Sequence, residues 1–109
     1  MARLESAVLT SSATYARNHA AQSERVETLR ARIAEATSGG RPDMVKRHRK
    51  RGKLLVRERI DLLVDPGTAF LELSSLAAHG QYGGDVPGAG IVTGIGIVHG
   101  LPCVIIAND

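Results

Sequence analysis

Residues 90–109 read GIVTGIGIVHGLPCVIIAND, and this stretch decides the fold. It contains two apolar runs, 91–98 and 101–107, separated by the dipeptide His99-Gly100. Apolar runs of this length on either side of a short glycine-containing turn are typical of two antiparallel strands. We therefore predict a β-hairpin with its tight turn at His99-Gly100.

The second run, Leu101 to Ala107, contains no charged residue and is apolar on both faces. A strand of this kind suits the centre of a sheet that is covered on each side. The helices expected upstream carry narrow apolar faces and nothing follows Asp109, so we expect the sequence to stop in mid-fold. On that expectation the isolated chain is poorly folded, with 101–107 exposed and prone to aggregate.

The first run has two faces of different character. One carries Ile91, Thr93, Ile95 and Ile97, and the other carries Val92, Gly94, Gly96 and Val98. Glycine inside a strand often marks a close approach by another backbone. The pair Gly94 and Gly96 is not a dinucleotide-binding fingerprint, because the third glycine is missing and no strand-to-helix turn follows.

Upstream of the hairpin, the pattern predicts one more strand and a loop. Ala69, Leu71 and Leu73 alternate with Phe70 and Glu72, which predicts a short strand with at least one buried face. Gly or Pro stands at positions 80, 83, 84, 87 and 88, so residues 79–89 are predicted to form a loop.

The first predicted helix runs from Tyr15 to Thr37, where good helix formers predominate. Val26, Leu29, Ile33 and Ala36 follow a helical spacing and form one apolar stripe. The helix is predicted to end at Ser38-Gly39-Gly40, because glycine after the last turn is a common stop signal. A narrow stripe on a polar helix favours docking on a neighbouring surface.

Two shorter helices are predicted next, over 43–51 and from Val56 onward. On the latter, Val56, Ile60, Leu63 and Val64 are predicted to share one face. Asp65-Pro66-Gly67 is predicted to end it and to turn the chain.

The net charge of +3 is unevenly distributed. Residues 41–59 contain nine Lys or Arg and two acidic residues, whereas the rest of the chain is net acidic. Three interpretations stay open: a solvated charged helix, a nucleic-acid surface, or a site for a smaller polyanion such as a nucleotide-containing coenzyme or an acidic patch on a partner. No aromatic residue interrupts the basic run, which makes nucleic acid the weaker of these.

Several kinds of site are not predicted. A single cysteine, Cys103, forms no internal disulfide and no structural zinc site, and the four histidines share no metal-ligand spacing. His48, His79 and His99 are therefore interpreted as surface residues.

No apolar stretch is long enough for a signal peptide or a membrane span. We expect a cytoplasmic protein, or a mitochondrial matrix protein if the source is eukaryotic.

Two separated blocks resemble a known family. The first block is RGKLLVRERIDLLVDPG at 51–67 with FLEL at 70–73, and the second is GAGIVTGIG at 88–96 with CVIIAND at 103–109. Both resemble the N-terminal part of carboxyltransferase (beta) subunits of biotin-dependent acyl-CoA carboxylases. The resemblance covers about residues 46–109. Its Gly-Ile-Gly and Ile-Ala-Asn-Asp motifs resemble the methylcrotonyl-CoA branch more closely than the propionyl-CoA branch.

The resemblance implies an α/β chain: N-terminal helices followed by the first strands of a crotonase-like fold of repeated ββα units, incomplete as given. Residues 1–67 would be a helical lead-in with a basic helix. Residues 68–109 would be the first strands of the N-terminal, acyl-CoA-binding domain. Subunits of this family are several times longer than this chain.

The resemblance also implies a function. The enzyme would transfer a carboxyl group from carboxybiotin to an acyl-CoA, with 3-methylcrotonyl-CoA of leucine breakdown favoured. The biotin would be carried by a partner biotin carboxylase/biotin carrier (alpha) subunit, and beta subunits would associate with one another. The catalytic groups of the family lie beyond Asp109, so no catalytic residue is assigned and the chain alone is expected to be inactive.

An accessory role in binding coenzyme A is implied for Arg57, Arg59 and Asn108. Arginine suits the phosphates, and Asn108 lies at the end of the last strand. The competing interpretation is structural: Glu58 would form an ion pair with Arg57 or Arg59. For the chain as a whole, the alternatives are a polyanion- or nucleic-acid-binding module on residues 41–59 and a helical interaction piece that uses Val26, Leu29 and Ile33.

Overall fold

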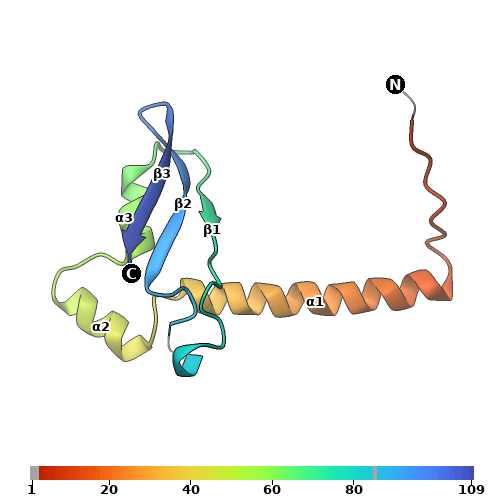
Figure 1. The fold of residues 1–109 in the computed structure, drawn as a ribbon, viewed down its shortest axis with the longest axis horizontal. Helices are drawn as coiled ribbons and strands as arrows, with labels where there is room; N and C mark the ends of the chain where they lie inside the picture. Colours follow the sequence, from red (N-terminus) through yellow and green to blue (C-terminus); the bar gives the residue numbers. More distant parts are fainter. Residues whose placement is uncertain (1–2, 85) are drawn as a thin grey trace. The chain divides into compact units, whose positions relative to one another are not determined.

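The computed structural model describes residues 3–84 and 86–109. The chain divides into two compact units, residues 1–31 and residues 32–109. The first unit contains most of helix α1 (Ala13–Thr37). The second contains α2 (Pro42–Lys50), α3 (Val56–Leu63), strands β1 (Leu71–Leu73), β2 (Ile91–Val98) and β3 (Leu101–Asn108), and a short 3-10 turn, η1 (Tyr82–Gly84) (Figure 1).

Helix α1 confirms the predicted first helix, with a start two residues earlier. Ser12 explains that start, because its Oγ accepts a hydrogen bond from the Tyr15 amide at 3.1 Å, as an N-capping side chain does. At the other end, Gly39 and Gly40 have φ of +84° and +91°, a left-handed backbone that favours glycine. The predicted stop at these glycines is confirmed.

Helices α2 and α3 correct two details of the prediction. Leu63 does not share the buried face of α3, since it is 51% exposed, whereas Val56 and Ile60 are buried. Val64 lies just after the helix and still packs against the core, because the chain is extended there. His48 is half-buried, and its Nε2 lies 2.9 Å from the Leu54 carbonyl oxygen, so it links α2 to the segment before α3.

The three strands form one antiparallel sheet in the order β1-β2-β3 (Figure 1). The hairpin turn is confirmed: His99 and Gly100 have φ of +51° and +76°, the left-handed pair that two-residue hairpin turns use. β3 was predicted to be a central strand. In this chain β2 is central and β3 is an edge strand.

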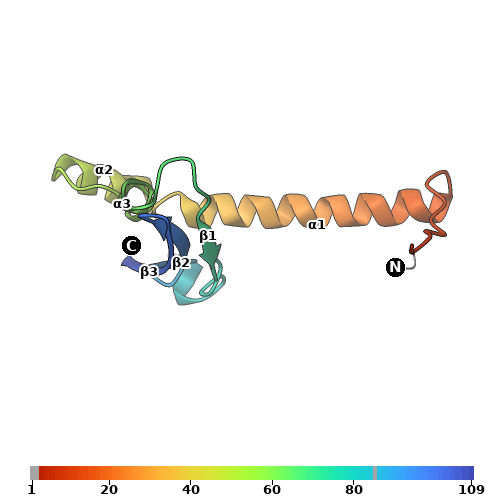
Figure 2. The ribbon, with the colours of Figure 1, turned by 90° about the horizontal axis from the view of Figure 1, so that it is seen from above.

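The sheet has an inner face, which packs against α3, and an outer face, which does not. The core of the inner face joins Val56 and Ile60 of α3 to Val92 and Ile105 of the hairpin. Val64, Phe70, Val98 and Ala107 pack around this cluster. Figure 2 shows α3 on one side of the strands.

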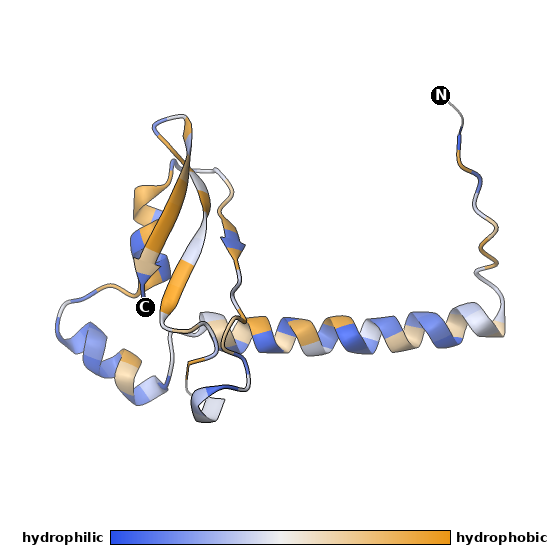
Figure 3. Cartoon of the chain, in the orientation of Figure 1, coloured by the Kyte–Doolittle hydropathy of each residue, from blue (hydrophilic) through white to orange (hydrophobic). Residues whose placement is uncertain are grey.

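The outer face is also apolar but stays exposed within this unit. β3 is coloured as hydrophobic along most of its length in Figure 3, whereas α2 is largely hydrophilic. Exposed apolar side chains of the sheet that point away from α3 are Leu71, Leu73, Ile91, Ile95, Val104 and Ile106. The predicted short strand is confirmed as β1. Phe70 and Glu72 face inward, whereas Leu71 and Leu73 face outward.

The strand glycines allow close approach, as predicted. A Cβ on Gly94 would lie 2.6 Å from the Leu71 carbonyl oxygen and would overlap the Phe70 ring. A Cβ on Gly96 would lie 2.7 Å from Val64 Cγ1. The groups that come close to the two glycines are thus side chains as well as the backbone of the neighbouring strand.

The predicted loop at 79–89 is confirmed for its described residues, 79–84 and 86–89, which contain turns and η1 and no strand. Residue 85 lies outside the described residues. The predicted domain boundary after residue 67 concerns the longer protein and stays a prediction. In this chain, α3 lies before that boundary and packs against strands that lie after it.

Candidate functional site

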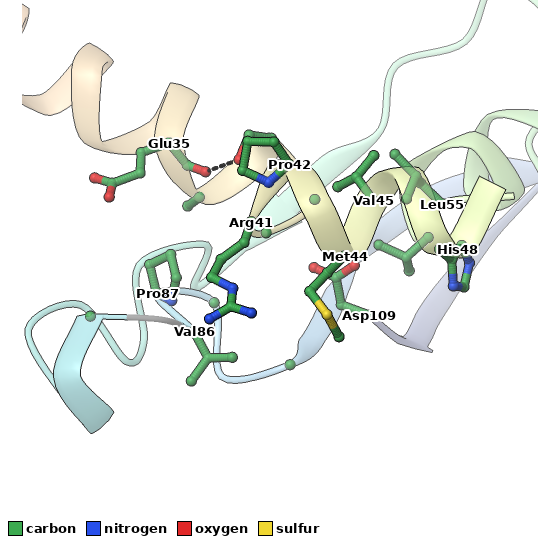
Figure 4. A pocket seen from close by; sticks show the side chains of 18 of the residues that line it. Glu35, Arg41, Pro42, Met44, Val45, His48, Leu55, Val86, Pro87 and Asp109 are labelled. Carbon is green, nitrogen blue, oxygen red and sulfur yellow. Dashed lines mark hydrogen bonds between the residues drawn. The ribbon is translucent and has the colours of Figure 1, made fainter. Parts of the chain in front are cut away.

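A hollow of about 720 Å³ lies in the unit of residues 32–109 (Figure 4). Its walls come from the end of α1, from α2, from the start of α3 and from the loop before β2. Charged or titratable side chains at its rim are Glu35, Arg41, His48, Arg59 and Asp109. Met44, Leu55 and Val86 supply apolar surface. The hollow therefore suits a ligand that combines an apolar part with an anionic group.

Arg41 and Arg59 bring positive charge to the hollow from different elements. In Figure 4, the Arg41 side chain extends from the start of α2 toward Val86 and Pro87. Its guanidinium also lies 3.1 Å from an oxygen of Asp43. This pair is exposed, so it holds Arg41 only weakly and leaves it available to an anion.

Arg59 and Asn108, two of the three residues expected to bind coenzyme A, come together in the fold. The Arg59 guanidinium donates a hydrogen bond to the Asn108 carbonyl oxygen at 2.5 Å. The next amide, that of Asp109, donates to the Gly90 carbonyl oxygen at 3.0 Å. Arg59 thus fixes the end of β3 beside α3 while its side chain lines the hollow.

Arg57 lies apart from that pair. Its guanidinium makes two hydrogen bonds to the Glu72 carboxylate, at 2.5 and 3.3 Å, across the inner face of the sheet. Both side chains are about three-quarters buried. Its Nη1 is buried without a hydrogen-bond partner among the described residues. The position of Arg57 therefore fits a link between α3 and β1 as readily as a ligand contact.

The predicted pairing of Glu58 with Arg57 or Arg59 is wrong. Glu58 instead pairs with Arg49 of α2 at 2.6 Å and accepts a hydrogen bond from the Leu55 amide at 2.7 Å. Adjacent residues of a helix point in different directions, so Glu58 cannot face its immediate neighbours. It caps the start of α3 and ties it to α2.

The rest of the basic segment behaves as a solvated surface. α2 has no buried residue, and Lys46, Arg47, Lys50 and Arg51 are exposed. This observation fits the interpretation as a charged, hydrated helix.

Asp65 is a structural residue that the sequence pattern did not single out. Its two carboxylate oxygens accept hydrogen bonds from the His99 and Gly100 amides at 2.8 and 2.7 Å. The hydrogen bond from Gly100, and then that from His99, stabilises the carboxylate and lowers the pKa of Asp65. Asp65 was interpreted only as part of the signal that ends the helix. The residues around it do not indicate a hydrogen-bond partner 35 residues away.

Three further observations concern possible metal sites, the cysteine and the helices of the described residues. No group of three His, Cys, Asp or Glu side chains within 3–84 and 86–109 is arranged to hold a metal ion. Cys103 is half-buried, with its Sγ 3.6 Å from the Leu101 carbonyl oxygen. Of the helices described, none is long and apolar enough to cross a membrane.

Comparison with known proteins gives a family match. The family model described as the carboxyl transferase domain matches residues 47–109. A curated relative is the biotin-dependent 3-methylcrotonyl-coenzyme A carboxylase beta1 subunit of Mycobacterium tuberculosis (strain H37Rv), which is 58% identical over 84 residues. That alignment covers 77% of this chain and 16% of the relative.

Two solved structures are also similar. The beta subunit of geranyl-CoA carboxylase from P. aeruginosa matches with a TM-score of 0.64 and 34% identity, over 97% of this chain and 20% of that chain. The transcarboxylase 12S structure, a hexamer assembly with methylmalonyl-coenzyme A bound, matches with a TM-score of 0.68 and 33% identity. That match covers 80% of this chain and 18% of the other. The chain thus spans less than a quarter of the length of each of these proteins.

Proposed function

The chain belongs to the carboxyl transferase domain family, and on that premise we propose that it is the N-terminal part of a carboxyltransferase (beta) subunit of a biotin-dependent acyl-CoA carboxylase. The observation that carries this proposal is the family match over 47–109, together with 58% identity to a named beta1 subunit. The described residues contribute scaffold and a rim of positive charge.

We propose 3-methylcrotonyl-CoA as the acyl-CoA substrate. Identity is 58% to the 3-methylcrotonyl relative, against 34% and 33% to the geranyl-CoA and methylmalonyl-CoA proteins. The carboxyl group would come from biotin on a biotin carboxylase/biotin carrier (alpha) subunit, and beta subunits would associate with one another. Such an enzyme would work in the cytoplasm, or in the mitochondrial matrix of a eukaryote.

Within this chain, we propose that the hollow beside Arg59 receives the phosphates of coenzyme A. Arg59 and Arg41 supply charge from two elements, and Asn108 lies at the point where Arg59 is held. A guanidinium presents several donors in a planar fork that matches phosphate oxygens. Arg57 is assigned a secondary part, because its guanidinium already binds Glu72.

A chimera tests the family function. This chain would replace the matching segment of the M. tuberculosis beta1 subunit, and carboxylation of 3-methylcrotonyl-CoA would be measured with and without avidin, which sequesters biotin. We expect avidin-sensitive activity and a preference for 3-methylcrotonyl-CoA over propionyl-CoA. An assembled chimera without activity, or one that prefers propionyl-CoA, would contradict the proposal.

A titration tests the assignment of Arg59. The 109-residue chain would be titrated with coenzyme A and with duplex DNA at several salt concentrations. We expect Arg59→Ala to weaken coenzyme A binding about tenfold, since it removes a charge-assisted hydrogen bond. Arg47→Ala, on the exposed side of α2, is the matched control and should have little effect. Tight, steeply salt-dependent DNA binding without coenzyme A binding would favour the nucleic-acid alternative instead.

A further inference from the structure

Helix α1 carries a seam of residues spaced alternately by four and three. Its members are Tyr15, His19, Gln22, Val26, Leu29 and Ile33. The rings of Tyr15 and His19 stack with centroids 5.8 Å apart, which confirms that these positions share a face. β-branched residues at 26 and 33 with Leu29 between them match the a and d positions of a two-stranded coiled coil.

The aliphatic half of this seam is exposed. Val26 is 43% and Leu29 is 49% exposed, and Ala36 is the residue of α1 that is buried. Leaving large aliphatic side chains in water is unfavourable, and their alignment on one helix makes them a ready docking surface.

The charges beside the seam are all of one sign. The flanking positions of the heptads are Ala16, Asn18, Ser23, Arg25, Arg30 and Arg32. The acidic residues of α1, Glu24, Glu27 and Glu35, stand on the remaining positions, away from the seam. Arg30 pairs with Glu27 at 3.0 Å, but both side chains are over 70% exposed and such pairs are weak.

A second copy of this helix is a poor partner for the seam. In a parallel pair, Arg25 of one helix would lie opposite Arg30 of the other, and in an antiparallel pair arginines would again meet. Like charges at flanking positions select against a pairing, whereas opposite charges select for it. A helix with acidic residues at its flanking positions could bury the aliphatic seam and also form ion pairs with the three arginines.

We propose that α1 docks an amphipathic helix of a partner protein, with an aliphatic seam and Asp or Glu at its flanking positions. This interaction goes beyond the carboxyltransferase function, and it gives the helical interaction surface a defined chemistry. Arg25, Arg30 and Arg32 would select the partner, and Val26, Leu29 and Ile33 would supply the buried contact.

Two synthetic heptad peptides test this proposal on the 109-residue chain. Both carry the same Leu/Val seam, one with Glu and the other with Lys at the flanking positions. By fluorescence anisotropy at low salt, we expect the Glu peptide to bind about tenfold tighter. The triple variant Arg25→Glu, Arg30→Glu, Arg32→Glu should reverse that order, and Leu29→Asn should weaken both peptides.

Glu24→Lys, on the far side of the helix, is the matched control and should leave the preference unchanged. Far-UV circular dichroism of each variant checks that α1 stays helical. Binding of neither peptide, equal binding of both, or a dimer of the chain that Leu29→Asn dissociates would each overturn the proposal.

Discussion

The two faces of the sheet are both apolar, yet they differ in what covers them. On the inner face, Val92 and Ile105 are 2% and 7% exposed beneath α3. On the outer face, Val104 and Ile106 are 74% and 68% exposed. Val104 and Ile105 are neighbours of similar chemistry in one strand, so the difference comes from the layer that packs on each face.

Glycine distinguishes the inner face of the sheet from the outer face. Gly94 and Gly96 leave space on the inner face that Phe70 and Val64 fill. The outer face presents Ile95 at the corresponding place, with no such space. The prediction that β3 is covered on both faces is thus met on one face in this chain. For the outer face it stays a prediction.

The largest expected effect comes from truncating neighbouring residues on opposite faces. Ile105→Ala should cost about 2–4 kcal/mol, because it leaves a cavity in the small inner core. Val104→Ala, at an exposed position, should cost less than about 0.5 kcal/mol. Amide hydrogen exchange of β2 and β3 measures both. Equal losses of protection would show that the two faces are not different.

A smaller effect is expected from filling the glycine space. Gly94→Ala places a methyl group against Phe70 and the Leu71 carbonyl oxygen and should cost about 1–3 kcal/mol. Gly88→Ala is the control, since its nearest neighbour would be 3.5 Å away, an ordinary contact. Amide hydrogen exchange of β2 measures the effect. If the β2 amides of Gly94→Ala were as strongly protected as those of the unchanged chain, the close packing of Phe70 against Gly94 would be refuted.

The smallest effect concerns pH and the hairpin turn. The pKa of Asp65 is lowered by the Gly100 and His99 amides, so the folded carboxyl titrates below its unfolded value of about 3.9. The resulting stabilisation is present above that value and is lost as the pH falls through the folded pKa. A carboxyl NMR titration of the folded chain should therefore give Asp65 a pKa below its unfolded value. Asp65→Asn should remove this pH dependence from the turn, and an Asp65 pKa at or above 3.9 would contradict the hydrogen bonds.

Much of the fold could be predicted from the sequence, because its signals are local. The turn at His99-Gly100, the stop at Gly39-Gly40 and the helical spacing of α1 each depend on a few adjacent residues. The direction in which β1 faces could not be predicted, since Phe70 packs inward only after Gly94 makes room for it.

The candidate site was predicted less completely, for a related physical reason. Arg59 and Asn108 meet across 49 residues, and Asp65 reaches a turn 34 residues away. Such pairings depend on how α3 lies on the hairpin, which no local pattern encodes. Glu58 was expected to bind a neighbouring arginine and instead binds Arg49, because helix geometry separates adjacent side chains.

Thiol labelling measures the difference between the two faces most directly. In a Cys103→Ser background, Val104→Cys and Ile105→Cys would each be treated with a maleimide under folding conditions. We predict that the thiol at position 104 reacts at nearly the rate of a free cysteine, and that the thiol at position 105 reacts roughly a hundredfold more slowly, since it needs local opening. Equal rates at the two positions would contradict an inner face closed by α3 and an outer face left open.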